Sequence, residues 1–376
     1  MNQMSQTSTQ PITLFGATGY TGQKIAQKLA RESLPFRIAG RSEERLKKLS
    51  RELPTQPDWL VADVDSPATL HALCKDTSLL INCAGPFTDL GERVIIQAAM
   101  NGVHYLDITN ELGYVFRVRG YGEMAKRHFA ALVPACGFEV ALADCAAYLT
   151  GSRLMEQDPD TPVDEVNVIY DLSGWGSSAG TRRSAVRALG TSWVAYRGGD
   201  WTGEIPSGRV KSFDLPGLGK RLTAFSFPSS ETVTIPYHLP VLRVNTWMTA
   251  SPLFRFWAPV LIPIAARLSR SIFRGLILSL AARGGWSAGD SPQGKPDLRS
   301  SFMIHVCARQ GSRSRWMTIS GGDPYEMTAE IIAYAARYMT GPGYDRRGLL
   351  APSQALDPRA LLEHGVASWG LRVEEG

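Results

Sequence analysis

The chain has 376 residues, of which 44% are hydrophobic and 20% are charged, a composition typical of a globular protein in water. This length exceeds what one compact core usually holds, so we expect more than one domain. Lysine and arginine exceed aspartate and glutamate by 40 to 35, a surplus that fits an anionic ligand and does not indicate nucleic-acid binding.

The cysteines and the N-terminus bear on the compartment. Five cysteines, at 74, 83, 136, 145 and 307, form no C-x-x-C pair and no Cys/His cluster with metal-ligand spacing. They predict reduced, mostly buried thiols in a cytoplasmic protein without a metal site. Residues 1–11 are polar and uncharged, unlike a secretory signal, and we expect a disordered tail there.

A glycine-rich stretch opens the first predicted domain. Residues 12–22 read ITLFGATGYTG, a short β-favouring run followed by glycines at 16, 19 and 22 and then by a helical pattern. Strand, glycine turn and helix begin a dinucleotide-binding unit, in which the helix N-terminus faces the phosphates. The alternative is a turn that only joins two packed elements. We assign these residues to the cofactor: Gly16, Ala17, Thr18, Gly19, Tyr20, Thr21 and Gly22.

Short apolar segments alternate with helical patterns as far as residue 150. The expected strands begin at 12 and continue with 35–39, 59–62, 79–83, 103–108 and 131–135, with helices at 43–53, 67–74 and 90–100 among those between them. Buried parallel strands have this character. The pattern predicts an α/β fold with a doubly wound, Rossmann-type parallel sheet over 12–150.

The carboxyl ends of these strands are the expected binding edge. After the second strand come Arg41 and Ser42 rather than an acid, which predicts NADP(H) over NAD(H) through contacts with the 2′-phosphate. The alternative for Arg41 is a solvated side chain, since Arg45 and Lys47 follow on a charged helix face.

Two further strand ends complete the predicted cofactor site. Asp63 and Val64 follow the third strand, where the adenine is usually bound; Asp63 accepts from the adenine amino group or caps the next helix, with Ser66 as the competing cap. After the fourth strand, small residues allow close approach of the nicotinamide ribose. Phe87 there is either a ring contact or a core aromatic. This segment comprises Cys83, Ala84, Gly85, Pro86 and Phe87.

Carboxyl groups are the candidate proton donors. Asp107 and Glu111 follow the fifth strand and Glu139 the sixth, and a carboxyl in a partly apolar cleft has a raised pKa. The alternative for each is a helix cap or a structural hydrogen bond. No Tyr-x-x-x-Lys pair follows the fourth strand, because Tyr121 and Lys126 are five apart, so a tyrosine-base mechanism is not supported.

The second half predicts an α+β substrate and dimerisation domain over 151–320, built on a largely antiparallel sheet. Expected strands include 163–170, 193–196, 222–227, 232–237, 242–248, 301–308 and 316–320. A helix at 181–189 carries Arg182, Arg183 and Arg187, which face an anionic group or simply the solvent. Residues 321–376 begin with a helix at 324–339 capped by Asp323, and we expect this part to return to the nucleotide domain.

Residues 252–283 combine apolar residues with arginines at helical spacing. Arg267, Arg270 and Arg274 recur at that spacing, so the segment resembles a basic amphipathic helix, and with Pro259 and Pro263 they leave no run long enough to cross a bilayer. Four roles remain open: contact with a membrane surface, a lid over a lipid-like substrate, a homodimer interface, or an ordinary core helix.

Several segments together resemble the saccharopine dehydrogenase-like family of NADP-binding oxidoreductases. They are GATGYTG (16–22), AGR (39–41), NCAGPF (82–87), GVHYLDITNE (102–111), CGFE (136–139) with Asp144, Ala179 to Ser184, and GGDPYEMTAE (321–330). Where the family reads G-F-D-x-x-P-x-D, this chain has GFEVALAD, which keeps both acids and lacks the proline.

The resemblance implies an NADP(H)-dependent reductase that transfers a hydride to a C=N or C=C bond of a small-molecule or acyl substrate. The family includes saccharopine reductases, which act on imines, and trans-acting enoyl reductases, which act on polyketide or lipid thioesters. A protein that binds NADPH as a redox sensor without turnover is the competing class.

Overall fold

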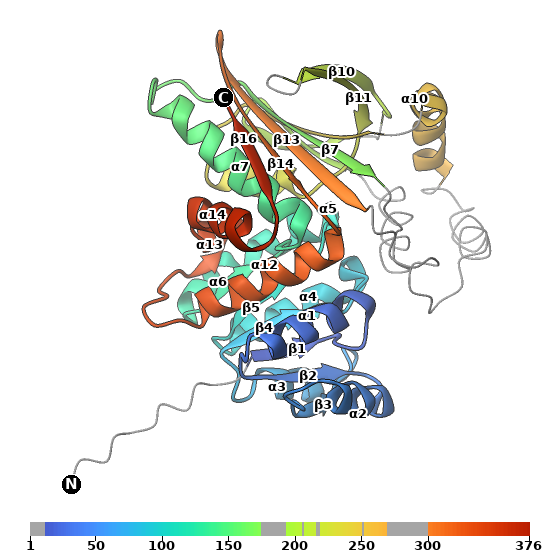
Figure 1. Cartoon of the computed structure of the whole chain (residues 1–376), viewed down its shortest axis with the longest axis vertical. Helices are drawn as coiled ribbons and strands as arrows, with labels where there is room; N and C mark the ends of the chain where they lie inside the picture. Colours follow the sequence, from blue (N-terminus) through green and yellow to red (C-terminus); the bar gives the residue numbers. More distant parts are fainter. Residues whose placement is uncertain (1–11, 174–192, 205–206, 216–218, 250–251, 269–299) are drawn as a thin grey trace.

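The computed structural model describes residues 12–173, 193–204, 207–215, 219–249, 252–268 and 300–376. Two sheets lie at opposite ends of the molecule, with helices between them (Figure 1).

The first sheet has seven strands in the order β15-β6-β5-β4-β1-β2-β3, and every neighbouring pair is parallel. This order is that of a doubly wound sheet, so the predicted Rossmann-type fold is confirmed. The strands are β1 (Ile12–Phe15), β2 (Phe36–Gly40), β3 (Trp59–Val61), β4 (Leu79–Asn82), β5 (His104–Asp107), β6 (Ala131–Val133) and β15 (Gly348–Leu349).

Helices connect these strands and cover the sheet with their apolar faces. In α1, for example, Ile25, Ala26 and Leu29 recur at helical spacing and are fully buried. The connecting helices are α1 (Tyr20–Arg31), α2 (Glu43–Glu52), α3 (Pro67–Cys74), α4 (Phe87–Met100), α5 (Leu112–Val118) and α6 (Gly122–Arg127), with a 3₁₀ turn at Arg119–Tyr121.

The second sheet has nine strands, mostly antiparallel, and only β12 and β7 run parallel among its described pairs. The predicted largely antiparallel sheet is therefore confirmed. Its strands are β7 (Glu165–Ser173), β8 (Trp193–Arg197), β9 (Asp200–Glu204), β10 (Val210–Leu215), β11 (Lys220–Ser226), β12 (Arg243–Thr249), β13 (Ser301–Gln310), β14 (Arg313–Gly321) and β16 (Arg372–Glu375).

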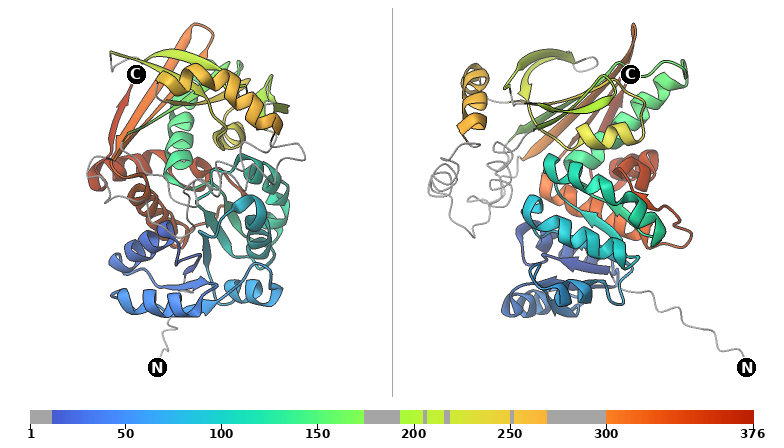
Figure 2. Two further views of the ribbon diagram at one scale, coloured as in Figure 1. Left: turned by 90° about the vertical axis from the view of Figure 1, so that its right-hand side faces the viewer. Right: turned by 180° about the vertical axis from the view of Figure 1, so that it is seen from behind.

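Helices α7 (Phe138–Met155) and α12 (Pro324–Met339) lie between the two sheets (Figures 1 and 2). Twelve of the 18 residues of α7 are buried, as expected for a helix packed on several sides. Helix α12 lies beside α1, where Lys28 pairs with Glu330 at 2.5 Å and Arg337 with Glu32 at 2.8 Å. The chain then forms α13 (Pro352–Ala355) and α14 (Pro358–Ser368).

One predicted strand is wrong. Residues 232–237 lie in a helical turn, α9 (Glu231–Thr234), followed by a 3₁₀ turn at Ile235–Tyr237. The run of β-branched residues favours a strand locally, but the Ser230 carbonyl accepts from the amide of Thr234, and Asn110 accepts from the amide of Ser230. Contacts across the fold thus override the local preference.

The predicted amphipathic segment is described as far as α10 (Pro252–Leu268), and 269–283 lies outside the described residues, as does the predicted helix at 181–189. None of the described helices is long and apolar enough to cross a membrane.

Candidate active site

The glycine loop after β1 forms a cradle for a pyrophosphate. Gly16 has a φ of 78°, and a Cβ there would lie 2.7 Å from the backbone nitrogen of Ala84. A Cβ on Gly22 would lie 2.4 Å from the Gly16 carbonyl oxygen, so this glycine allows helix and loop to touch. Helix α1 begins after Gly19 with no side-chain cap, which leaves its first amides available to an anion. The loop therefore fits a dinucleotide.

Two arginines lie beside this loop. Arg41 is exposed directly after β2, and Ser42, which was predicted to contact the 2′-phosphate, caps α2 by accepting from the Arg45 amide at 3.4 Å. Arg45 was expected only as part of a charged helix face, but its guanidinium donates to the Thr18 carbonyl at 2.7 Å. Arg45 therefore joins Arg41 as a candidate for the cofactor's 2′-phosphate.

The end of β3 holds Asp63 in a local turn. Its Oδ1 accepts from the Asp65 amide at 3.0 Å, and its backbone exchanges hydrogen bonds with the Thr69 hydroxyl. Ser66 occupies the N-cap position of α3, though without a side-chain cap bond. Val64 is 7% exposed and belongs to the core.

Glu111 organises the loop after β4. Its two carboxylate oxygens accept from the amides of Phe87 at 3.0 Å and Thr88 at 2.7 Å, so it caps α4 from a neighbouring connection. The loop contains a cis peptide bond between Gly85 and Pro86. The ring of Phe87 is buried and lies 5.8 Å from that of Tyr114, and burial raises the pKa of the Cys83 thiol.

Asp107 is fully buried and accepts four hydrogen bonds. Oδ1 accepts from the amides of Thr109 at 3.1 Å and Ala135 at 2.8 Å, and Oδ2 accepts from the hydroxyls of Tyr105 and Tyr114, both at 2.9 Å. Burial raises its pKa to about 6, and these donors limit the rise. The carboxylate thereby joins the ends of β5 and β6.

Glu139 lies in the first turn of α7, where the chain leaves β6. Its Oε2 accepts from the side-chain nitrogen of Asn110 at 3.0 Å. Burial raises the pKa of Glu139 to about 7; the hydrogen bond from Asn110 opposes the rise, and the nearby carboxyl of Glu231 adds to it. A carboxyl with this pKa can hold or release a proton near neutral pH.

Sequence reasoning missed the partners of Glu139. Glu231 is fully buried in α9, accepts from the hydroxyl of Tyr170 on β7, and has one oxygen, Oε2, without a protein partner in the described structure. Burial raises the pKa of Glu231, with Ser229 and Tyr170 donating to it. Glu139 and Glu231 lie 92 positions apart and share no motif, so no sequence signal indicated this carboxyl pair.

A second carboxylate lies deeper along α7. Asp144 Oδ1 lies 2.9 Å from His238 Nε2, and its Oδ2 accepts from the Ser353 amide at 2.9 Å. Burial alone would raise the pKa of Asp144, but His238 and Ser353 hold it below its usual value. Asp144 thus stays ionised and fixes α13 to α7, whereas Glu139 is the acid that can be protonated.

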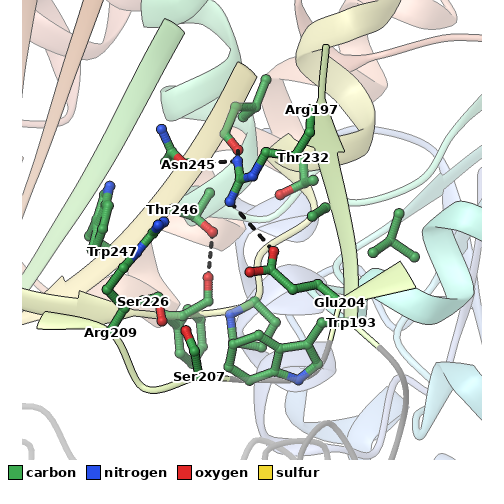
Figure 3. A pocket seen from close by; sticks show the side chains of 15 residues that line it. Trp193, Arg197, Glu204, Ser207, Arg209, Ser226, Thr232, Asn245, Thr246 and Trp247 are labelled. Atoms are coloured by element: carbon green, nitrogen blue, oxygen red, sulfur yellow. Dashed lines mark hydrogen bonds and ion pairs between the residues drawn. The ribbon is translucent and has the colours of Figure 1, made fainter. Parts of the chain in front are cut away.

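A cationic groove crosses the second sheet. It encloses about 390 Å³ and is lined by Arg197, Arg209, Lys211 and Arg243, and Glu165 is the one acid among the described residues that line it. An adjoining pocket shares Arg197 and Arg209 and extends to Thr232, the neighbour of Glu231 in sequence (Figure 3). These clustered positive charges attract anions.

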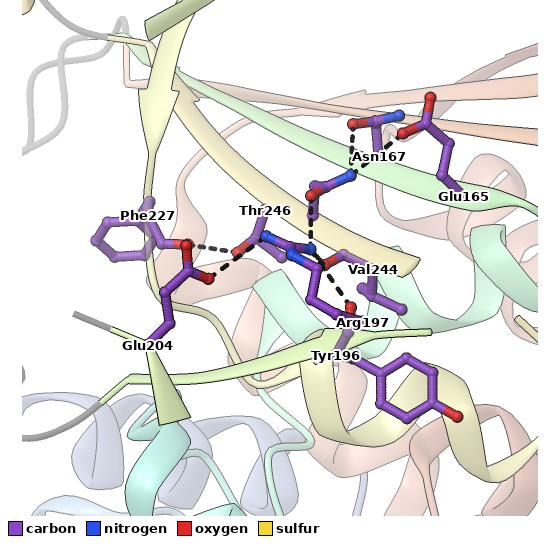
Figure 4. Close-up of polar contacts among 9 residues, drawn as sticks. Glu165, Asn167, Tyr196, Arg197, Glu204, Phe227, Val244 and Thr246 are labelled. Carbon is purple, nitrogen blue, oxygen red and sulfur yellow. Dashed lines mark hydrogen bonds and ion pairs between the residues drawn. The ribbon is translucent and has the colours of Figure 1, made fainter. Parts of the chain in front are cut away.

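Arg197 is held firmly where the two cavities meet. It donates to Asn245 Oδ1 at 2.9 Å and to the Val244 carbonyl at 3.2 Å, and it pairs with Glu204 at 3.5 Å (Figure 4). Burial lowers the pKa of Arg197, and the charges of Arg209 and Arg243 contribute to the lowering. The cations are therefore close enough to repel one another, and an anion in the groove would relieve that repulsion.

Two further predictions from the sequence concern an arginine cluster and the absence of a metal site. Arg182, Arg183 and Arg187 lie outside the described residues. Within the described segments, no three His, Cys, Asp or Glu side chains are grouped closely enough to hold a metal ion.

Residues 12–134 match the family described as "Saccharopine dehydrogenase NADP binding domain". The chain is 32% identical to the trans-acting enoyl reductase of Mycobacterium tuberculosis, over 93% of this chain and 94% of that protein, and 31% identical to that of Mycobacterium leprae with the same coverage. A mouse saccharopine dehydrogenase-like oxidoreductase is 30% identical over 38% of this chain and 38% of its own length.

The saccharopine dehydrogenase (L-Glu forming) of Saccharomyces cerevisiae shares the fold. Its TM-score is 0.63 at 14% identity, and the match covers 98% of this chain and 99% of that one. The predicted cofactor and enzyme class are confirmed. The chain belongs to the saccharopine dehydrogenase-like family and is an NADP(H)-dependent oxidoreductase.

Proposed function

We propose that this protein is an enoyl reductase, which uses NADPH to reduce the carbon–carbon double bond next to the carbonyl of an acyl thioester. The observation that carries the proposal is Glu139, a half-buried residue whose carboxyl has a pKa of about 7 at the carboxyl edge of the nucleotide-binding sheet. Similarity to mycobacterial trans-acting enoyl reductases along nearly the whole chain supports this choice of reaction.

NADPH supplies the hydride in such a reduction, and the protein must supply a proton to the neighbouring carbon. Glu139 is the candidate donor, because a carboxyl that titrates near neutral pH can both give up a proton and recover it. Asn110 holds its Oε2, and burial keeps the pKa of Glu139 high, with a smaller contribution from the carboxyl of Glu231. Glu111 shapes the loop after β4 through two amides and does not need to touch the substrate.

The polar groups around Glu139 favour an enoyl thioester over the imine of an amino acid and a keto acid. Such an imine carries several carboxylates, which need cationic partners. Among the described residues, the partners of Glu139 and Glu231 are Asn110, Ser229 and Tyr170, all neutral. None of these described partners supplies the positive charge that such a carboxylate needs.

The cationic groove favours a thioester substrate that carries a phosphate at the end remote from its acyl group. Coenzyme A and carrier proteins both present acyl groups on a phosphopantetheine arm, and Arg209, Lys211 and Arg243 could bind that phosphate. The adjoining pocket leads from the groove toward α9.

The free, buried or partly buried state of the cysteines supports a cytoplasmic location. Cys74, Cys136 and Cys145 are buried and Cys83 and Cys307 partly buried, and all five are free. Reduced cysteines of this kind are usual in the cytoplasm.

The test is NADPH consumption by the purified protein with 2-enoyl thioesters of increasing chain length, with keto acids mixed with amines as a parallel pool. We expect turnover only with the thioesters. Turnover confined to the keto acid and amine pool would contradict the proposal and indicate imine reduction. A second comparison, of coenzyme A thioesters with N-acetylcysteamine thioesters, tests the groove: Arg243→Gln should raise KM for the first and leave KM for the second unchanged.

A further inference from the structure

We infer that helix α10 docks the protein onto an anionic lipid surface. This inference is independent of the reaction proposed above. It rests on an exposed apolar face of α10 and on the charge of the chain around it.

The exposed face is concentrated and one-sided. Of the eleven large apolar side chains exposed in the described part of the chain, five lie between 256 and 264. Their spacing places them on one side of the helix. They are Phe256 (74% exposed), Trp257 (47%), Val260 (50%), Leu261 (50%) and Ile264 (49%).

The opposite side of α10 holds the helix to the protein. Ala258 and Ile262 are buried against Trp193 and Phe225 of the second sheet. Gly208 lies so close that a Cβ there would be 2.2 Å from the Ala258 carbonyl oxygen. The exposed face is thus presented by an anchored helix at the β10–β11 end of the sheet, where α10 projects from the body of the molecule (Figures 1 and 2).

The charge of the surrounding sequence identifies the occupant. Residues 232–289 contain six arginines, at 243, 255, 267, 270, 274 and 283, and no lysine, aspartate or glutamate. The rest of the chain has 34 basic and 35 acidic residues, so this stretch accounts for the entire positive surplus of the protein.

An apolar helix face with an aromatic pair, in a part of the sequence whose charged residues are all arginine, matches the interface of an anionic membrane. The rings of Phe256 and Trp257 lie 5.4 Å apart, and aromatic side chains of this kind favour the headgroup region. An anionic lipid surface offers an apolar layer to the exposed face and negative headgroups to the arginines that flank it in sequence.

The experiment is co-sedimentation of the full chain with vesicles of phosphatidylcholine containing phosphatidylglycerol, with pure phosphatidylcholine vesicles as reference. We expect binding to the anionic vesicles, weakened by added salt. Trp257→Ser with Leu261→Ser should lower the partition coefficient at least about tenfold, since each buried apolar side chain contributes roughly that much. Val366→Ser is the matched control, because Val366 is also 50% exposed but lies on α14.

NADPH affinity serves as the folding check, since α10 lies far from the glycine loop. Wild-type protein that ignores anionic vesicles, or a double variant that binds them as well as Val366→Ser does, would overturn the inference. A wild-type dimer that the double variant converts to monomer, without vesicle binding, would instead assign this face to a second copy of the chain.

Discussion

Asn110 donates from its side-chain nitrogen to Glu139 Oε2 over 3.0 Å, and its carbonyl oxygen accepts from the amide of Ser230, the residue before Glu231. One neutral amide thus connects the first turn of α7 to α9, which carries the second carboxyl of the pair. This arrangement keeps both acids at the edge of the nucleotide-binding sheet, and it makes their protonation the property on which activity should depend.

Replacement of Glu139 tests its role as proton donor. Because the protonated form is needed, kcat of the wild type should fall as pH rises through about 7. Glu139→Gln should lower kcat by about 10²–10⁴-fold and abolish this pH limb, with NADPH affinity unchanged. Glu156→Gln, at the far end of the same helix, is the control and should behave as wild type. A Glu139→Gln enzyme that keeps its rate would exclude this residue.

Replacement of Glu231 tests whether it tunes Glu139 without touching the substrate. The charge of Glu231 raises the pKa of Glu139, so Glu231→Gln should move the descending limb of kcat to lower pH. The measurement is the pH profile of kcat beside a thermal unfolding curve. A variant that only loses stability, with its pH limb in the original place, would reduce Glu231 to a packing role.

The 2′-phosphate contact can be measured as cofactor preference. Arg41→Ala and Arg45→Ala should each weaken NADPH binding by about ten- to a hundredfold relative to NADH, because a charge-assisted hydrogen bond is lost. Arg51→Ala is the matched control, since Arg51 is an exposed arginine in the last turn of the same helix. An unchanged NADPH-to-NADH ratio in both variants would place the 2′-phosphate elsewhere.

Two glycine-to-alanine substitutions should change different properties of the protein, NADPH binding in one and stability in the other. Gly16→Ala should abolish NADPH binding, because the residue has a φ of 78° and its Cβ would meet Ala84 N at 2.7 Å. Gly113→Ala, on helix α5, meets nothing closer than 3.9 Å and should raise stability by about 0.5–1 kcal/mol. Isothermal titration with NADPH and urea unfolding separate the two outcomes.

Asp107 should make stability depend on pH. Its pKa is raised from 3.8 to about 6 in the folded protein, so the folded state holds this proton more tightly than the unfolded state. The resulting stabilisation is complete below the unfolded pKa and is lost as pH rises through about 6, a change of about 3 kcal/mol in the free energy of unfolding.

The Asp107→Asn variant has no titrating carboxyl at this position. The free energy of unfolding of the wild type, minus that of the variant, should therefore fall by about 3 kcal/mol between about pH 3 and about pH 7. Urea unfolding at several pH values gives this difference directly. Parallel curves for the two proteins would contradict the raised pKa.

Local signals were sufficient for much of the fold. Helix α3 occupies 67–74 and α12 occupies 324–339, both as predicted, because proline at the first position and a following apolar period mark such helices clearly. Asp323 caps α12 by accepting from the amides of Tyr325 and Glu326. Six of the seven parallel strands were recognisable because each is short, apolar and bounded by turn residues, whereas β15 has only two residues and was not predicted.

The candidate site depended on contacts that no local pattern contains. Glu231 meets Glu139 only because α9 packs beside α7, and α9 itself was predicted as a strand from its β-branched residues. The sequence does not distinguish Arg45 from the other charged residues of α2. Its hydrogen bond to the Thr18 carbonyl depends on where α2 lies relative to the glycine loop. Glu139 and Glu231 are 92 positions apart in the sequence, and only the tertiary fold brings them together.

The most direct test of the proposed reaction is isotope tracing with NADPH deuterated at its transferable position and a 2-enoyl thioester, with the product analysed by mass spectrometry. Enoyl reduction predicts one deuterium at carbon 3 of a saturated thioester, and in heavy water with unlabelled NADPH one deuterium at carbon 2. Unreduced thioester, together with deuterium transferred to a new amine product from the keto acid and amine pool, would contradict the account.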